Sequence, residues 1–210
     1  MTQKTVVFDF GGVLFRTSAT EFYSEVFERN GHTTESLQYF LNTVFTNQDR
    51  SQSNRGNAQD IIDQKSRQYP EWHQEIEAFS AEKEFIKTVR GVVPGMNALL
   101  KEIVQEGHRI VGLTNWHGDT FDTLPQAFPE IIKYFDQIIV SGKVGLRKPD
   151  LEIFRLAQSE YGNPEVSGVY YFDDKERNIQ AAQEAVNWNT FVFKDANTVR
   201  QALAMTPQPL

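Results

Sequence analysis

The sequence contains no cysteine, which excludes disulfide bonds and thiolate metal sites. It also lacks an apolar run long enough to span a membrane, and its N-terminus shows no signal-peptide pattern. Clusters of lysine and arginine are missing too. The formal net charge is −7 at pH 7, whereas nucleic-acid binding depends mainly on neutralising phosphates. These absences predict a soluble cytoplasmic protein with no membrane or nucleic-acid partner.

What the chain does contain is enough apolar surface for a sizeable core. Of its 210 residues, 40% are hydrophobic and 12% aromatic, which excludes a disordered chain. This length suits one well-buried domain, or one domain with a large insertion.

The stretch from Thr5 to Leu14 (TVVFDFGGVL) has the layout of a site at the end of a strand. The apolar run before Asp9 predicts a buried strand, and a charge directly after it is costly without a partner or a function. Gly11 and Gly12 allow a tight turn and close approach to a ligand. Taken alone, the stretch is equally compatible with an aspartate that only caps a turn.

Residues 16–90 are predicted to form a small helical bundle. Apolar side chains recur there at helical spacing, with breaks at Asn30-Gly31, at Gly56 and at Tyr69-Pro70. The last helix is expected from about Glu71 to Val89. We expect the aromatic side chains of this segment to form its core.

From residue 93 onward, short apolar strands alternate with helices. The strands are expected at Arg109–Leu113, Gln137–Val140, Gly168–Phe172 and Thr190–Phe193, and Pro149 is expected in the first turn of a helix. This alternation predicts an α/β fold with a Rossmann-like parallel sheet. Residues 1–15 and 91–210 would form this core, and residues 16–90 an inserted α-helical cap over the carboxyl ends of the strands.

Polar side chains follow four of the five predicted strands. They are Asp9, then Thr114-Asn115, then Arg147-Lys148, and finally Asp173-Asp174 with Asn178 one turn later. Because parallel strands end at the same edge of a sheet, these groups should meet there. Each alone is commonplace, but the ordered combination of acid, hydroxyl, amine and acid pair is specific.

The charges of this set predict a magnesium site that binds a phosphate. Three carboxylates placed together would repel one another, and Lys148 with one divalent cation would balance them. Oxygen ligands favour Mg²⁺. Thr114, Lys148 and the backbone N–H groups of Gly11 and Gly12 would then meet the phosphate. Asp9 is the expected nucleophile, forming an aspartyl-phosphate.

The motifs VVFDFGGVL, IVGLTN, VGLRKPD and VYYFDD resemble, in order and spacing, the four motifs of the haloacid dehalogenase superfamily of phosphohydrolases. The resemblance covers essentially the whole chain, helical cap included. The segments EGHRIVGLTN, GLRKPD and FDDKERNIQAA are most similar to the subgroup that includes bacterial α-D-glucose-1-phosphate phosphatases and the N-terminal domain of soluble epoxide hydrolases.

This resemblance implies a role for each matching residue. Asp9, the Gly11 carbonyl and Asp174 would bind Mg²⁺, with Asp173 acting through water or as an alternate ligand. Asn178 would hold the acid loop, and Asn115 would touch the phosphate or the substrate.

One position departs from the family pattern. The family's phosphatases usually carry a second aspartate two residues after the nucleophile, where this chain has Gly11. General acid–base catalysis is worth about 10²- to 10⁴-fold in rate. Three hypotheses follow: a substrate with a good leaving group, such as a sugar 1-phosphate or acyl phosphate; a substitute acid, for which His117 is best placed; or a slow or non-catalytic binder.

Several other residues are assigned by position. Arg55, in a cap loop, and His117 are candidate substrate contacts, while Arg16 lies at the cap hinge. Trp116 and His117 either line the cap–core cleft or pack ordinarily. His108 is expected to be structural, and His32 and His73 to be solvated.

The sequence as a whole predicts a Mg²⁺-dependent phosphatase of a small phosphorylated metabolite, as a monomer or homodimer. The alternatives are a haloacid dehalogenase-type hydrolase, which uses the aspartate without metal, and a weakly active binding protein.

Overall fold

The computed structural model describes residues 3–46, 58–79, 86–161 and 168–204. Its centre is a five-stranded sheet in the order β5-β4-β1-β6-β7, in which every neighbouring pair is parallel. The strands are β1 (Thr5–Phe8), β4 (Arg109–Thr114), β5 (Gln137–Val140), β6 (Val169–Asp173) and β7 (Asn189–Val192). The predicted α/β fold and its five strands are confirmed.

The central strand β1 is buried on both faces, which explains its continuous apolar sequence. Val6 and Phe8 belong to one hydrophobic cluster and Val7 to the other. Successive side chains of a strand point to opposite faces, so β1 contributes to both layers of the core.

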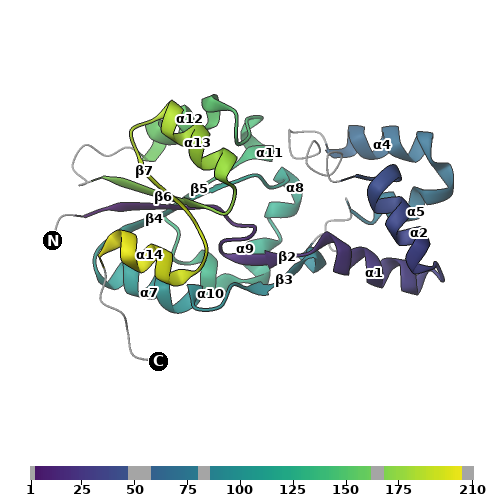
Figure 1. Cartoon of the computed structure of the whole chain (residues 1–210), viewed down its shortest axis with the longest axis horizontal. Coiled ribbons are helices and arrows are strands. Elements are labelled where there is room, and N and C mark those ends of the chain that lie inside the picture. The colour runs from purple at the N-terminus through teal and green to yellow at the C-terminus, as the bar shows by residue number, and fades with distance from the viewer. Residues whose placement is uncertain (1–2, 47–57, 80–85, 162–167, 205–210) are drawn as a thin grey trace.

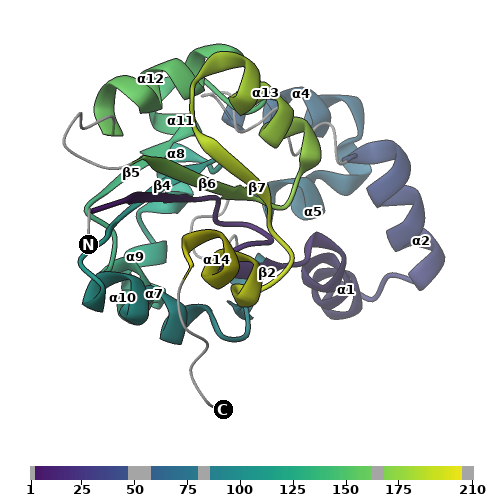
Figure 2. The same cartoon turned by 60° about the vertical axis from the view of Figure 1, so that its left-hand side comes forward.

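Helices cover both faces of the sheet (Figures 1 and 2). On the Val6 face lie α7 (Met96–Gln105), α10 (Pro129–Ile132) and α14 (Ala196–Leu203). On the Val7 face lie α12 (Leu151–Tyr161) and α13 (Glu176–Ala185). The remaining short helices of this part are α8 (Gly118–Phe121), α9 (Leu124–Ala127) and α11 (Ser141–Val144). None of the described helices is long and apolar enough to cross a bilayer.

The segment between β1 and β4 contains a helical bundle that stands beside the sheet (Figure 1). It consists of α1 (Ala19–Arg29), α2 (Thr34–Tyr39), the π-helical turn η1 (Phe40–Val44), α4 (Ala58–Gln68), the 3₁₀ turn η3 (Pro70–Trp72) and α5 (His73–Glu77). Phe22, Tyr23, Phe27 and Phe40 are buried in it. The expectation that the aromatic side chains of this segment form its core is confirmed for these residues.

Two strands at the roots of the bundle were not predicted. β2 (Phe15–Thr17) pairs antiparallel with β3 (Val89–Val92), which follows the 3₁₀ turn η4 (Ile86–Thr88). The prediction of a helix that extends to Val89 is therefore wrong. Val89–Val92 instead forms a strand that pairs with residues more than seventy positions earlier in the chain. The predicted boundaries at 15/16 and 90/91 fall inside β2 and β3, and the division into core and cap stays a prediction.

The helix after the Lys-Pro motif begins later than predicted. Pro149 lies in a turn, and α12 starts at Leu151. The carbonyl of Arg147 accepts the N–H of Asp150 (2.8 Å) in that turn. The turn places Lys148 beside the sheet edge before the helix begins.

Candidate active site

The carboxyl ends of β1, β4 and β6 meet at one edge of the sheet. Phe8 is in register with Gly112 and Phe172, and the N–H of Asp9 donates to the Phe172 carbonyl (3.0 Å). One oxygen from each of Asp9, Asp173 and Asp174 lies within 4.8 Å of the others. The three carboxylates that the sequence singles out are therefore brought together.

Lys148 holds two of these carboxylates. Its ammonium lies 2.9 Å from Asp9 Oδ1 and 2.7 Å from Asp173 Oδ2, and it donates to the Leu113 carbonyl (2.7 Å). The side chain is 1% exposed. Burial opposes the ammonium form, but Asp173 and Asp9 outweigh it, and the pKa of Lys148 lies above its ordinary value. The lysine is therefore a fixed positive charge.

Asp9 is buried, and its carboxylate is oriented before any ligand binds. Oδ1 accepts hydrogen bonds from the Phe10 N–H (2.7 Å) and from Lys148. Burial raises the pKa of Asp9 from 3.8 to about 6; Lys148 lowers it and Asp173 raises it. At pH 7 this carboxylate is ionised but poorly solvated, which suits a nucleophile or a metal ligand.

Asp173 is surrounded by donors. Its oxygens accept from Lys148 Nζ, the Tyr171 hydroxyl (2.5 Å), the Lys175 N–H (2.9 Å) and the Asn178 amide (2.9 and 3.0 Å). Burial alone would raise its pKa, but Lys148 and these hydrogen bonds hold the pKa below the ordinary value. Asp173 is thus the ionised anchor that positions Lys148, and its role as a metal ligand stays a prediction.

Asp174 and Gly12 form the solvent-facing side of the site. The Asp174 side chain is 33% exposed and lies 3.8 Å from the Lys175 ammonium. Gly12 has φ +84°, and a Cβ there would lie 2.6 Å from Asp174 Oδ2. Glycine is required at this position by both backbone conformation and space.

Gly11 differs from Gly12 in both respects. Its φ lies outside the left-handed region, and in the part of the chain that the structure describes a Cβ would meet Thr17 Oγ1 at 3.7 Å and Thr17 Cγ2 at 3.9 Å, which are ordinary contacts. The N–H of Gly12 donates to the Phe15 carbonyl (2.8 Å) inside the loop. The phosphate contacts of Gly11 and Gly12 stay predictions, but a side chain at position 11 is sterically allowed.

Thr114 and Asn115 end β4 at the same edge. Thr114 is 1% exposed. The Asn115 amide donates to the Lys148 carbonyl (2.8 Å) and accepts the Lys148 N–H (2.9 Å). Asn115 therefore clamps the backbone that carries the lysine, while its contact with a substrate stays a prediction.

His117 and Trp116 are both buried, at 4% and 5% exposure. The His117 ring lies 5.3 Å from that of Phe79, edge to face, so the helical segment contacts the sheet domain here. Burial lowers the pKa of His117 from 6.5 to about 4. A neutral, buried imidazole at pH 7 is poorly suited to replace the missing acid.

The other sequence candidates lie elsewhere. Arg55 lies outside the described residues. Arg16 donates to the Arg90 carbonyl (2.8 Å) across β2 and β3. His108 is buried at the opposite edge, where Nδ1 faces the Lys4 N–H (3.4 Å), in keeping with a structural role.

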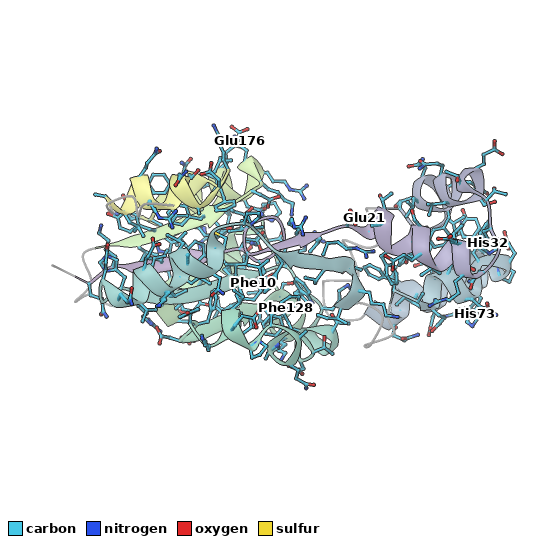
Figure 3. All side chains as sticks on the ribbon, turned by 90° about the horizontal axis from the view of Figure 1, so that it is seen from below. Phe10, Glu21, His32, His73, Phe128 and Glu176 are labelled. Carbon is cyan, nitrogen blue, oxygen red and sulfur yellow. The ribbon has the colours of Figure 1, made fainter. Side chains whose placement is uncertain are left out.

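His32 and His73 both lie in the helical bundle, far from Phe10, the neighbour of Asp9 (Figure 3). His73 is exposed, as expected. His32 is exposed too, although its Nε2 lies 3.0 Å from the buried Glu75 carboxylate and its ring centroid lies 5.0 Å from that of Phe27.

Sequence reasoning missed Tyr171, which donates to Asp173. The signal was available: residues i and i+2 of a strand share one face, so Tyr171 in VYYFDD had to lie beside Asp173. Phe79 had no comparable signal, since its contact with His117 joins distant parts of the chain.

The donor set fits a hard divalent cation. The carboxylates of Asp9, Asp173 and Asp174 offer the kind of oxygen ligand that Mg²⁺ takes. Burial raises the pKa of Asp174, with Lys175 opposing, and a bound cation would relieve this cost of holding a carboxylate beside Asp173.

Comparison with known structures supports the fold. A HAD-like family hydrolase from Porphyromonas gingivalis superposes with a TM-score of 0.69 at 18% identity, covering 98% of this chain and 100% of that one. A HAD family enzyme from Bacteroides thetaiotaomicron, in complex with magnesium and inorganic phosphate, gives 0.62 at 20% identity, over 92% and 95%. At these identities the likeness shows the fold alone.

Among curated proteins, drimenol cyclase drtB of Aspergillus calidoustus is 30% identical over 104 residues. The match covers 50% of this chain and only 19% of that protein. The family model of haloacid dehalogenase-like hydrolases matches residues 3–185, which include Asp9, Thr114, Lys148 and the acid pair. The chain therefore belongs to the haloacid dehalogenase-like hydrolases.

Proposed function

We propose that the protein is a Mg²⁺-dependent phosphatase that hydrolyses a small phosphorylated metabolite through an aspartyl-phosphate on Asp9. The carrying observation is the buried Lys148 ammonium between Asp9 and Asp173, 2.9 and 2.7 Å away, beside a third carboxylate. This arrangement keeps a nucleophilic carboxylate ionised and supplies positive charge where a phosphate dianion would arrive. Sugar phosphates are the first substrates to test, in line with the subgroup that the motifs resemble.

The residues have separate roles in this proposal. Asp9, the Gly11 carbonyl and Asp174 would hold Mg²⁺, with Asp173 supporting the site while it accepts its hydrogen bonds. When bound, the cation would neutralise phosphate charge. Thr114 and Lys148 would hold phosphate oxygens, and the cap would select the substrate. Gly12, Asn115, His117 and Arg55 are the further candidate contacts.

The reaction would proceed in two displacements. An Asp9 carboxylate oxygen forms a bond to phosphorus while the bond to the leaving oxygen breaks and its electron pair stays on that oxygen. Water then attacks the phosphoryl group, which releases phosphate and regenerates Asp9. Because Phe10 and Lys148 already orient Asp9 Oδ1, little reorganisation is needed.

Two alternatives to the phosphatase can each be weighed against a specific observation. A metal-free dehalogenase-type hydrolase would share the nucleophile, but the partly exposed Asp174 would repel an anionic substrate in the absence of a cation. A weakly active phosphate binder would be consistent with glycine at position 11.

The test is an assay of the purified protein with p-nitrophenyl phosphate and a panel of sugar phosphates, in Mg²⁺ and in EDTA. We expect turnover only with Mg²⁺ and none for Asp9→Asn. Dehalogenation in EDTA would favour the first alternative. Phosphate binding without turnover of any phosphate would favour the second, and turnover by Asp9→Asn would contradict the mechanism.

A further inference from the structure

Among the described residues outside its chain neighbours, Thr17 has the side chain nearest to Gly11, where the family's second aspartate is missing. A Cβ built on Gly11 would lie 3.7 Å from the Thr17 hydroxyl oxygen and 3.9 Å from its methyl group. Among the described residues, no other heavy atom outside the chain neighbours comes as close. A side chain at position 11, two residues after the nucleophile, would therefore lie next to Thr17.

The Thr17 side chain is accessible to solvent water. It is exposed on β2, and within the described ranges no hydrogen bond of its hydroxyl is found. Its backbone is held by pairing with Val89, and the next residue, Ser18, donates its N–H to the Thr88 carbonyl (2.9 Å). The hydroxyl is thus carried by a fixed strand but remains free to bind water.

We propose that the Thr17 hydroxyl positions a solvent water beside the leaving-group oxygen, in the space next to Gly11. Water held there partly replaces the acid that position 11 lacks. The inference rests on the proposed phosphatase function. Thr17 acts through the water, so it is a positioning residue and not a proton donor to the substrate.

The chemistry balances with two waters. As the P–O bond breaks, its electron pair stays on the leaving oxygen, which takes a proton from the water held by Thr17 and leaves hydroxide. A second water, which Thr17 does not hold, attacks the phosphoryl group on Asp9 and breaks the bond between phosphorus and the Asp9 oxygen. This step releases dihydrogen phosphate and restores the Asp9 carboxylate, and the hydroxide takes one proton from the released phosphate to give water and hydrogen phosphate.

This role predicts an effect that depends on the leaving group. An alkyl phosphate leaves as a strongly basic alkoxide and needs the proton, whereas p-nitrophenolate leaves with little protonation. A neutral hydroxyl that orients water is worth about one ordinary hydrogen bond, roughly tenfold in rate. Its loss should therefore be visible only with the poorer leaving group.

The experiment compares Thr17→Val and Thr17→Ser with the parent protein on glucose 6-phosphate and p-nitrophenyl phosphate, in Mg²⁺. For Thr17→Val we expect kcat on glucose 6-phosphate to fall about tenfold, with p-nitrophenyl phosphate changed less than twofold. Thr17→Ser keeps the hydroxyl and should restore the rate. Thr20→Val, the same substitution at an exposed site on α1, is the matched control and should change neither rate.

A second background tests the link to position 11. Gly11→Asp should raise turnover of glucose 6-phosphate, because it restores an acid at a position where a Cβ makes ordinary contacts. In this background Thr17→Val should lose its selective effect, since the acid no longer depends on the water.

Two kinds of result overturn the inference while leaving the phosphatase function intact. One is an equal loss on both substrates, and the other is no loss on either. Failure of the parent protein to turn over any phosphate in Mg²⁺ would overturn the phosphatase function and this inference with it.

Discussion

At the scale of single residues, two adjacent glycines behave differently. Gly12 has φ +84°, and a Cβ there would clash with the Asp174 carboxylate, while a Cβ on Gly11 makes ordinary contacts with Thr17. The pair looks alike in sequence, but only Gly12 is demanded by the backbone. On steric grounds, position 11 therefore tolerates a Cβ. Glycine at this position matters for the chemistry of the site and not for the backbone conformation.

The first prediction concerns Gly12→Ala. Left-handed backbone costs a non-glycine residue about 1–2 kcal/mol, and the added Cβ would push Asp174 out of place. We expect lower stability in urea and, by calorimetry, a Mg²⁺ affinity reduced by about tenfold or more.

Gly31→Ala is the control for this substitution. Gly31 has φ +74°, and no atom of the described residues that could clash lies within 4 Å of the added Cβ. It should show the conformational cost alone, with unchanged Mg²⁺ affinity. Equal Mg²⁺ affinity in Gly12→Ala and the parent would argue against Asp174 as a ligand.

At the scale of elements, the site depends on contacts between loops that follow different strands. Asn115 follows β4, and its amide makes two hydrogen bonds with the backbone of Lys148, which follows β5. Lys148 in turn reaches Asp9 after β1 and Asp173 at the end of β6. The four strand ends are thereby joined in one network.

The second prediction concerns Asn115→Ala. It removes both hydrogen bonds to the Lys148 backbone, at about 1 kcal/mol each, and lets the lysine shift. We expect a loss of about 1–3 kcal/mol in urea unfolding and a fall in kcat of about tenfold or more.

Asn115→Asp serves as the comparison. It keeps the acceptor for the Lys148 N–H and loses the donor to the carbonyl, so it should lie between the parent and Asn115→Ala in activity. Full activity in Asn115→Ala would show that the clamp is dispensable.

At the scale of the whole molecule, the helical bundle and the sheet domain share a buried contact close to the site. Phe79, at the end of the described bundle, is 5% exposed and meets His117. The ring centroid of Phe45 lies 5.3 Å from that of Phe79. The bundle thus contributes to the surroundings of His117, whose burial lowers its pKa.

The third prediction concerns Phe79→Ala. Truncating a buried phenylalanine typically costs about 3–5 kcal/mol, and His117 becomes solvated. Its pKa should then rise from about 4 toward 6.5, as measured by NMR titration of the imidazole. Phe79→Leu, which keeps most of the apolar volume, should move the pKa less.

The sign of the pH dependence follows from the same contact. Since the pKa of His117 is lower in the folded state, its contribution to stability is complete above pH 6.5 and is lost as the pH falls toward 4. Phe79→Ala should flatten this part of the stability profile. An unchanged His117 pKa in that variant would show that a group other than Phe79 shields the imidazole from solvent.

Much of this architecture could be predicted from local sequence patterns. The apolar runs ending at Phe8, Thr114 and Asp173 mark strands, because a strand buried on both faces must be apolar throughout. Parallel strands end at one edge, so the polar residues after them were bound to meet. The sequence by itself thus determined the sheet and the membership of the acid–lysine cluster.

Only the tertiary structure decided which partners these residues contact. The β2–β3 pair, the Asn115 clamp, the Phe79–His117 contact and the closeness of Thr17 to Gly11 each join residues with no shared local pattern. Helical and strand periodicities specify which face of an element is buried, but not the partner across the gap. That partner is chosen by packing and by the need to satisfy buried polar groups.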